Sequence, residues 1–205
     1  MNGRAFWTVA AGRGELREAA VPAPGPDEML VRSLASGISR GTEALVFAGR
    51  VPVSEYAHMR APLMDGDFPF PVKYGYAVVG RDEAGARVFV LHPHQDVFVA
   101  PAAMCVAVPD AVPTRRAVLA ANMETALNIA WDAAALPGER VLVIGAGVVG
   151  LLVAWLLARI PATTVTLVDL LPERAAIAAR LGCGFALPGA APGEQDLVVH
   201  ASASE

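Results

Sequence analysis

Short apolar runs separated by turn residues dominate the first half of the chain. Turn material such as Pro22–Pro26 and Asp65–Asp67 interrupts them. Short β-prone runs at this spacing predict strands, and a small barrel rather than alternating strands and helices. The predicted strands are Ala5–Val9, Met29–Leu34, Tyr76–Val79, Val88–Leu91 and Val97–Val99. We therefore expect residues 1–113 to form a β-rich domain.

The pattern changes at Thr114, which precedes an alanine-rich stretch. We expect Thr114 to cap a long helix that runs towards Ala135, with Pro137 and Gly138 ending it. Residues 114–205 then form the second predicted domain, an α/β unit that begins with this helix.

A run without charged side chains, Val141–Ala158, follows, and a second apolar run, Val165–Asp169, ends in an acid. A helix is predicted from Pro172 to Gly182. A further strand, Asp196–His200, is expected after the loop 188–195. The order of these elements predicts strand, turn, helix and strand, as in a nucleotide-binding βαβ unit.

The first of these runs contains a Gly-x-Gly-x-x-Gly motif at Gly145, Gly147 and Gly150. In a dinucleotide site one glycine makes the turn, one lets the backbone approach the pyrophosphate, and one lets helix and strand pack closely. The helix N-terminus adds unpaired N–H groups and a partial positive charge. Asp169 follows Gly150 by 19 residues, near the roughly 20 expected for a ribose-binding acid.

A membrane span is the alternative for this segment, because 18 uncharged residues lie between Arg140 and Arg159. The β-branched run before the glycines, the position of Asp169 and the helix after Pro172 favour the dinucleotide site instead. We therefore expect no membrane association.

The net charge of −4 gives no reason to expect a nucleic-acid partner. No basic-then-apolar segment opens the chain, so we expect a cytoplasmic protein. The two cysteines, Cys105 and Cys183, lie far apart and form no Cys-x-x-Cys pair. Both are expected to be buried small side chains rather than ligands of a structural zinc ion.

A β-rich domain followed by a long helix and this glycine motif resembles the medium-chain dehydrogenase/reductase superfamily, the relatives of alcohol dehydrogenase. The segments Glu15–Glu18, Pro22–Pro26, Glu28–Val31 and Ala35–Ile38 carry the resemblance by their order and spacing. It implies a GroES-like β-barrel followed by a Rossmann doubly wound sheet. The C-terminal half of that sheet has no counterpart here, so we expect a fragment of a longer protein or a truncated product.

The chain departs from the zinc-dependent members of this superfamily at each ligand position. Ser39–Glu43 stands where they carry a cysteine, Gly75–Ala77 where they carry Gly-His-Glu, and Ala121 where they carry a third ligand. The cysteine-rich lobe is missing between Gly85 and Pro101. These side chains cannot replace zinc ligands, so we predict no metal. Residues 36–43 are locally similar to the bacteriochlorophyllide dehydrogenase branch, and zinc-free quinone reductases are a second comparison.

Without a metal, a hydrogen-bond donor or proton acceptor must act on the substrate oxygen. Thr42 matches the hydroxyl relay residue of the family if one residue is inserted after Ser39. Tyr76 stands where a zinc-binding histidine is expected. The alternatives are a turn-stabilising or helix-capping threonine and a tyrosine packed in the barrel.

Two further residues are candidates for catalysis. His92 and His94 are spaced for one face of a strand, but Pro93 and the lack of a third ligand favour a turn with solvated or hydrogen-bonded histidines. One of them, assigned here as His94, can carry protons near neutral pH. Glu124 lies where the family meets the nicotinamide, and an exposed helical acid is the alternative.

Asp169 also predicts the cofactor, because a carboxylate there accepts both ribose hydroxyls and repels a 2′-phosphate. Leu170–Pro172 bring no compensating cation, so NAD is favoured over NADP. The resemblance places Arg40 at the pyrophosphate, Thr125 at the nicotinamide and Arg174 near the adenine, with surface arginines as the alternative for Arg40 and Arg174. The full set of predicted cofactor contacts is Arg40, Thr125, Gly145, Gly147, Val148, Val149, Gly150, Asp169, Arg174 and Ala201.

These observations predict a zinc-independent, NAD-dependent oxidoreductase that interconverts an alcohol and a carbonyl of a small molecule, in the cleft between the two domains. Two alternatives stay open. One is a truncated dinucleotide-binding module without turnover, and the other is a reductase of carbon–carbon double bonds in enones or quinones. The substrate is not identified, and a homodimer of a longer form is left open.

Overall fold

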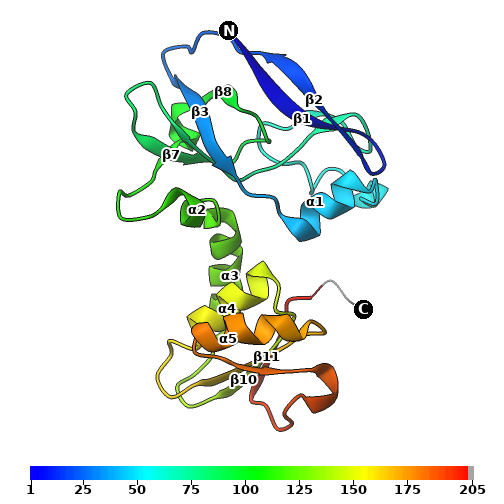
Figure 1. The fold of residues 1–205 in the computed structure, drawn as a ribbon, viewed down its shortest axis with the longest axis vertical. Helices are drawn as coiled ribbons and strands as arrows, with labels where there is room; N and C mark the ends of the chain where they lie inside the picture. The colour runs from blue at the N-terminus through cyan, green and yellow to red at the C-terminus, as the bar shows by residue number, and fades with distance from the viewer. Residues whose placement is uncertain (203–205) are drawn as a thin grey trace. The chain divides into compact units, whose positions relative to one another are not determined.

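A computed structural model describes residues 1–202. The chain divides into two compact units, Met1–Ala121 and Asn122–Glu205 (Figure 1). The domain boundary expected after residue 113 stays a prediction. Within the described residues, no helix combines the length and the apolar character needed to cross a bilayer.

The first unit contains two antiparallel sheets. One has the strand order β2-β1-β5-β4, in which β1 (Asn2–Ala10) and β2 (Arg13–Ala20) form a hairpin. The short strands β4 (Asp65–Gly66) and β5 (Val72–Lys73) complete it. Strand β2 is absent from the prediction because charged residues alternate along it and Leu16 is its one large apolar side chain.

The second sheet of this unit has the order β8-β3-β6-β7-β9. Three of its strands confirm apolar runs predicted as strands, within one or two residues at each end, and β6 begins at Val78 rather than Tyr76. The inward side chains of these strands, among them Val31, Val78 and Phe98, form the core. The strands are β3 (Glu28–Ser36), β6 (Val78–Arg81), β7 (Arg87–Val90), β8 (Val97–Pro101) and β9 (Val106–Ala107).

A helix that the apolar pattern does not predict follows β3. Helix α1 (Arg40–Phe47) begins after Ser39, whose backbone N–H donates to Glu43 Oε1 at 2.7 Å. The backbone N–H of Glu43 in turn donates to Ser39 O at 2.9 Å. This reciprocal pair fixes the first turn of α1, as side-chain caps do at helix N-termini. Two short 3-10 helices, Val53–Glu55 and Ala102–Met104, occur in the loops of this unit.

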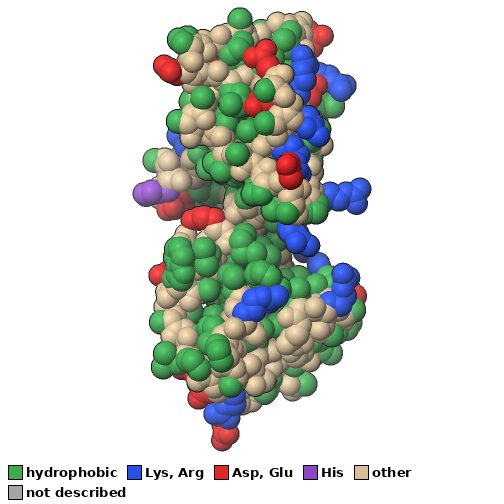
Figure 2. Space-filling view, turned by 90° about the vertical axis from the view of Figure 1, so that its left-hand side faces the viewer, with side chains coloured by type: hydrophobic (Ala, Val, Ile, Leu, Met, Phe, Trp, Pro, Cys, Tyr) green, Lys and Arg blue, Asp and Glu red, His purple; other side chains and the backbone are tan. Residues whose placement is uncertain are grey.

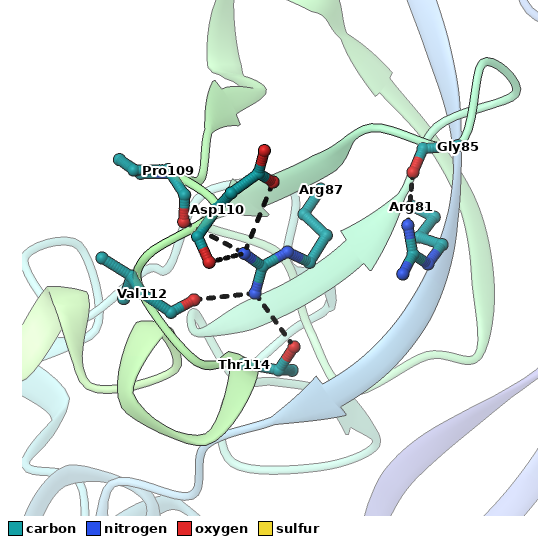
Figure 3. A network of polar contacts seen from close by, with 7 residues as sticks. All are labelled: Arg81, Gly85, Arg87, Pro109, Asp110, Val112 and Thr114. Atoms are coloured by element: carbon teal, nitrogen blue, oxygen red, sulfur yellow. Dashed lines mark hydrogen bonds and ion pairs between the residues drawn. The ribbon is translucent and has the colours of Figure 1, made fainter.

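Arg87 on β7 anchors the segment that leads to the next helix (Figure 3). Its guanidinium donates to the backbone oxygens of Val112 at 2.7 Å, Pro109 at 3.0 Å and Asp110 at 3.1 Å. Nearby Arg81 makes one such bond, to Gly85 O at 2.5 Å. One buried side chain therefore holds a whole loop against the sheet.

The long helix predicted from Thr114 is wrong in its details. Helix α2 (Thr114–Ala117) and helix α3 (Ala120–Ala133) are separate, and Pro113 rather than Thr114 is the N-cap residue. The N–H of Leu119 bonds to Arg116 O, three residues back, and this tightened turn ends α2.

The second unit is built on a parallel sheet of order β12-β11-β10-β13. Its buried residues include Val141, Val153 and Leu167, and they form one core between sheet and helices. Strand β12 is absent from the prediction because it is only three residues long. The strands are β10 (Arg140–Ile144), β11 (Thr164–Val168), β12 (Gly184–Ala186) and β13 (Leu197–His200).

Helix α4 (Val148–Leu157) directly follows the glycine turn. The helix predicted between Pro172 and Gly182 is confirmed as a 3-10 turn, Pro172–Arg174, that continues into α5 (Ala175–Arg180). A 3-10 turn, Pro188–Ala190, lies in the predicted loop. Hydrophobic side chains, green in the lower part of Figure 2, also reach the surface of this unit. Its exposed large hydrophobic residues include Trp131, Leu136, Leu170 and Val198.

Candidate functional site

The glycine turn of the second unit needs glycine at two of its three positions. Gly145 has φ +99°, and its N–H donates to Val168 O at 2.7 Å. A Cβ at Gly150 would collide with the carbonyl oxygen of Gly145. The first turn of α4 therefore packs directly on the backbone that leaves β10, as the strand–turn–helix prediction requires.

Gly147 differs from the other two, because the space in front of it is open. It is the N-cap residue of α4 and is exposed, and a Cβ built on it meets no described heavy atom within 4 Å. A helix N-terminus attracts anions through its free N–H groups and its dipole. An open approach to such a terminus fits a pyrophosphate, which a side chain at this position would obstruct.

Asp169 lies at the carboxyl end of β11 with its carboxylate turned to the glycine turn. Oδ2 accepts the N–H of Ala146 at 2.7 Å, and Oδ1 accepts the N–H of Leu171 at 2.9 Å. Carboxylate oxygens have further lone pairs after these bonds. The carboxylate is therefore oriented by the backbone and keeps acceptor capacity for a ligand hydroxyl.

A cavity of about 430 Å³ opens beside this carboxylate. Its walls are mainly apolar, while Asp169 supplies a charge at its edge. The lining residues are Leu142, Ile144, Gly145, Val168, Asp169, Leu170, Pro188, Ala191 and Ser202. Apolar walls with one oriented carboxylate fit the adenosine part of a dinucleotide.

The other predicted cofactor residues of this unit lie on helix α4, after strand β13 and in the 3-10 turn before α5. Val148 is exposed on the first turn of α4, and Val149 packs against the core. The N–H of Ala201 donates to Ile144 O at 2.8 Å, and its Cβ lies 3.4 Å from a Cβ built on Gly150. Arg174 is half-buried and lies outside the lining of the 430 Å³ cavity.

Two predicted residues lie on α3. Glu124 is exposed and accepts a hydrogen bond from Asn128 Nδ2 at 2.5 Å, one turn further along the helix. Thr125 is also exposed. Their predicted contacts with the nicotinamide stay predictions.

The first unit has a larger cavity, of about 530 Å³, between β1, the end of β3 and α1. Apolar side chains such as Phe6, Ile38 and Phe47 cover much of it, while Ser36, Glu43 and His94 bring polar groups together. The remaining lining residues are Thr8, Arg40, Ala44, Val46 and Tyr74. Of the predicted site residues, this cavity brings together Arg40 and His94.

His94 is hydrogen-bonded through both ring nitrogens. Its Nε2 lies 2.6 Å from Glu43 Oε2, and its Nδ1 lies 2.9 Å from Ser36 Oγ. The side chains of His94 and Glu43 are only 13% and 12% exposed. A largely desolvated carboxylate–imidazole pair that ends on the hydroxyl of an exposed serine is a competent acid–base arrangement.

The ring of His94 is held in place by its surroundings. A Cβ at Gly75, which has φ +122°, would lie 2.9 Å from the ring atoms Cδ2 and Nε2. The backbone N–H of His94 donates to Tyr74 O at 3.2 Å, and its carbonyl accepts the N–H of Phe6 at 2.9 Å. Gly75 therefore makes room for the imidazole that the backbone bonds position.

His92 has a different environment from His94. It is 4% exposed, its ring stacks on Phe98 at a centroid distance of 3.6 Å, and its Nδ1 donates to Pro93 O at 2.8 Å. Burial lowers the pKa of His92 to about 4, so the ring is neutral and does not carry protons near neutral pH. Within residues 1–202, no three His, Cys, Asp or Glu side chains are placed to hold a metal ion.

Thr42 and Tyr76 lie outside the lining of the 530 Å³ cavity. Thr42 is the third residue of α1 and not its cap. Tyr76 packs edge-on against Tyr74 at 6.2 Å, next to the core that the Tyr74 ring belongs to. Their assigned catalytic roles stay predictions.

Tyr74, rather than Tyr76, contributes a phenol ring to the cavity wall. Its hydroxyl donates to Met59 O at 2.7 Å. Burial raises the pKa of Tyr74 to about 12, with smaller contributions from Tyr76 and Glu43. This phenol therefore holds its proton and has its hydrogen bond already made.

Ser36, Glu43 and Tyr74 are cavity residues that the sequence prediction does not include. Ser36 and Glu43 are the first and last residues of the Ser-Gly-Ile-Ser-x-Gly-Thr-Glu segment that carries part of the family resemblance. The capping-box signal for a helix start is an acid three residues after the cap, and Thr42 occupies that position, so Glu43 falls one residue too late to match it. Its contact with His94 spans 51 residues, and no local pattern shows it.

No protein-family model matches the sequence, and no curated protein matches it. Solved structures do match its fold. An alcohol dehydrogenase from Escherichia coli CFT073 in complex with NADH has TM-score 0.80 and 18% identity, and the match covers 99% of this chain and 70% of that one. A quinone oxidoreductase from Thermus thermophilus, also solved with NADPH, has TM-score 0.70 and 24% identity over 90% of this chain and 59% of that one.

A third similar structure is the alcohol dehydrogenase of Thermus sp. ATN1, with TM-score 0.73 and 21% identity over 93% of this chain and 64% of that one. The chain thus spans between 59% and 70% of the length of these three proteins. Their fold is that of the medium-chain dehydrogenases/reductases. The predicted fold class, a GroES-like β domain followed by the first part of a Rossmann sheet, is confirmed.

Proposed function

We propose that this chain is a zinc-independent, NAD(H)-dependent oxidoreductase that interconverts an alcohol and a carbonyl. The observation that supports this proposal most directly is the glycine turn of the second unit. There, Gly147 leaves open the approach to the N-terminus of α4, and backbone N–H groups orient the Asp169 carboxylate. The solved structures support a nicotinamide cofactor because those from E. coli and T. thermophilus were solved with NADH and NADPH.

In this proposal the second unit binds the cofactor and the first unit binds the substrate. The turn at Gly145–Gly150 holds the pyrophosphate, and Asp169 binds the adenosine ribose. The cavity of the first unit holds the substrate against apolar walls. When bound, a nicotinamide cofactor supplies or accepts the hydride. The protein supplies the proton of the alcohol, and His94 with its two partners is the acid–base group in reach of the cavity.

The preference for NAD over NADP is part of the same proposal. A 2′-phosphate would lie against the Asp169 carboxylate, and like charges at contact repel. The nearest following residues, Leu170 and Leu171, carry no charge. NADH binding should therefore exceed NADPH binding.

Reduction of a carbon–carbon double bond is the second candidate, and one observation favours it. Quinone oxidoreductases from T. thermophilus and Pseudomonas syringae share the fold with TM-scores of 0.70 and 0.71. Parallel assays with benzaldehyde and 2-cyclohexenone, each with NADH, distinguish the two chemistries. Consumption of the enone double bond without alcohol formation would favour this second candidate.

Titration of the 205-residue chain with NADH and NADPH, by calorimetry, tests the dinucleotide site directly. Gly147→Ala places one methyl group in the open approach, and we expect at least tenfold weaker NADH binding. Gly193→Ala is the matched control, because a Cβ there also meets no described atom within 4 Å but lies in a loop after the Pro188–Ala190 turn. Equal NADH affinity of the two variants would contradict the site.

A further inference from the structure

Ser36 and His94 line two separate hollows of the first unit. One is the 530 Å³ cavity described above. The other is a shallower hollow of about 290 Å³ that also includes Ser33, Arg4 and Asp96. Phe6 is the third residue common to both. The hydroxyl and imidazole therefore border the cavity on one side and a second, more polar hollow on the other.

The two polar groups of this border and the carboxylate of Glu43 form a continuous hydrogen-bonded series. Ser36 Oγ lies 2.9 Å from His94 Nδ1, and His94 Nε2 lies 2.6 Å from Glu43 Oε2. A carboxylate only accepts, so Nε2 carries its hydrogen towards Glu43. In the neutral ring, Nδ1 is then an acceptor, and the hydroxyl of Ser36 donates to it.

The acid of this series is fixed independently of the histidine. Glu43 Oε1 accepts the backbone N–H of Ser39 at 2.7 Å, which leaves Oε2 for the ring. Gly75 leaves the ring the room it occupies. Charged groups nearby are Arg40 in the cavity and the Arg4–Asp96 pair, 3.6 Å apart, in the second hollow. None of these breaks the series from Ser36 to Glu43.

We propose that Ser36, His94 and Glu43 are a proton relay between the second hollow and a substrate oxygen in the cavity. The proposal rests on the proposed function, because it provides the proton for carbonyl reduction. Ser36 is the catalytic residue, since its hydroxyl is the member of the series that would contact the substrate. His94 and Glu43 act through it and are positioning residues.

In the direction of reduction, the carbonyl carbon would receive a hydride from a bound reduced nicotinamide dinucleotide, which would leave in its oxidised form. The π electron pair of the carbonyl moves to its oxygen, which takes the proton of Ser36 Oγ. Ser36 Oγ takes the Nδ1 proton of the His94 imidazolium, and the ring becomes neutral while Nε2–H stays on Glu43. A proton from bulk solvent, carried by water in the second hollow, then returns to Nδ1, so each turnover consumes one hydride and one proton.

Nitrogen-15 NMR of histidine-labelled protein tests the relay without turnover. The chain has four histidines, and His94→Asn identifies the His94 signals. The neutral His94 ring should be the Nε2–H tautomer, with Nδ1 showing the shift of a hydrogen-bonded acceptor. Ser36→Ala should move the Nδ1 signal, whereas Ser54→Ala, at an exposed serine that lines neither the cavity nor the second hollow, should not. An Nδ1–H tautomer overturns the relay.

Kinetics with NADH and benzaldehyde supply the second readout. Ser36→Ala should lower kcat about 100-fold and Glu43→Gln about 10-fold, with NADH affinity unchanged. The solvent deuterium isotope effect on kcat should fall towards one in Ser36→Ala. Ser54→Ala should stay within about twofold of the wild type. A Ser36→Ala variant that keeps the wild-type kcat overturns the relay.

The two proposals fail in different ways. A folded wild-type chain that binds neither NADH nor NADPH refutes the proposed function, and the relay, which supplies the proton for that reaction, is refuted with it. Normal NADH binding and turnover together with an Nδ1–H tautomer refutes the relay and leaves the proposed function standing.

Discussion

The two candidate sites of this molecule are built in opposite ways. The glycine turn consists of consecutive residues, Gly145–Gly150, completed by one acid at the end of the next strand. The polar series of the first unit joins Ser36, Glu43 and His94, from the end of a strand, a helix and a loop. The turn depends on close backbone packing, which leaves no room for a side chain at Gly150. The series depends on side chains that come from positions far apart in the sequence. The two sites should therefore respond to different kinds of substitution.

The turn should fail when a side chain is added. In Gly150→Val the new Cβ would collide with the carbonyl oxygen of Gly145. We expect a loss of about 4 kcal/mol or more in the free energy of unfolding of the second unit, because the obstacle is backbone. Hydrogen exchange by unit measures it, and the first unit should be unaffected. Gly193→Val is the control, and equal protection in both variants would contradict the packing argument.

The free energy of unfolding of the first unit should depend on pH. His92 has a folded pKa of about 4 against an ordinary value of 6.5, so the unfolded chain binds more protons between these values. The neutral ring therefore contributes stability above pH 6.5, and this contribution is lost as pH falls towards 4. The difference corresponds to about 3 kcal/mol.

Urea unfolding at pH 4.5 and pH 7 checks this contribution. His92→Phe keeps a ring against Phe98 and cannot be protonated, so its stability should change less between the two pH values than that of the wild type. His58→Phe, at a side chain that is 81% exposed, is the control and should retain the wild-type dependence. The same pH dependence in all three proteins would contradict a buried neutral His92.

The same contrast decides how much of the molecule the sequence could predict. The strands of the second sheet and the glycine turn follow from local apolar runs and glycine spacing. Strand β2 escapes prediction because charged residues dominate it, and helix α1 because its eight residues are too few to show a helical period. The contacts of His94 span 51 and 58 residues, and a single sequence contains no periodicity that pairs such positions.

Two neighbouring arginines, Arg81 and Arg87, test how much contacts between residues distant in the sequence contribute to stability. In Arg87→Met three backbone carbonyls lose their donor, and the Arg87 side chain is only 13% exposed. We expect a loss of about 2 kcal/mol in the free energy of unfolding. Arg81→Met removes a single exposed bond to Gly85 O and should cost under about 0.5 kcal/mol. Figure 3 shows both arginines. Equal midpoints of urea unfolding would contradict the anchoring role of Arg87.

The smallest expected effect concerns the charge at the glycine turn, and two aspartates of the second unit test it. Asp169 follows β11 at the carboxyl edge of the sheet, and Asp196 precedes β13 at the amino edge. Each accepts a backbone N–H, Asp169 from Ala146 at 2.7 Å and Asp196 from Arg140 at 2.8 Å. Each change to asparagine removes one negative charge. A comparison of the two variants therefore shows whether an effect on cofactor binding depends on where the charge lies or only on the net charge.

Asp169→Asn should weaken NADH binding about tenfold, or about 1.4 kcal/mol, because the amide is a poorer acceptor for the ribose hydroxyls. NADPH should lose less or gain, because the repulsion of its 2′-phosphate is removed. Asp196→Asn should bind both cofactors as the wild type does, since its carboxylate lies at the opposite edge of the sheet. Calorimetric titration of both variants measures the two ratios. If Asp169→Asn binds NADH like Asp196→Asn, the carboxylate serves only to fix the turn, and the preference for NAD must arise elsewhere.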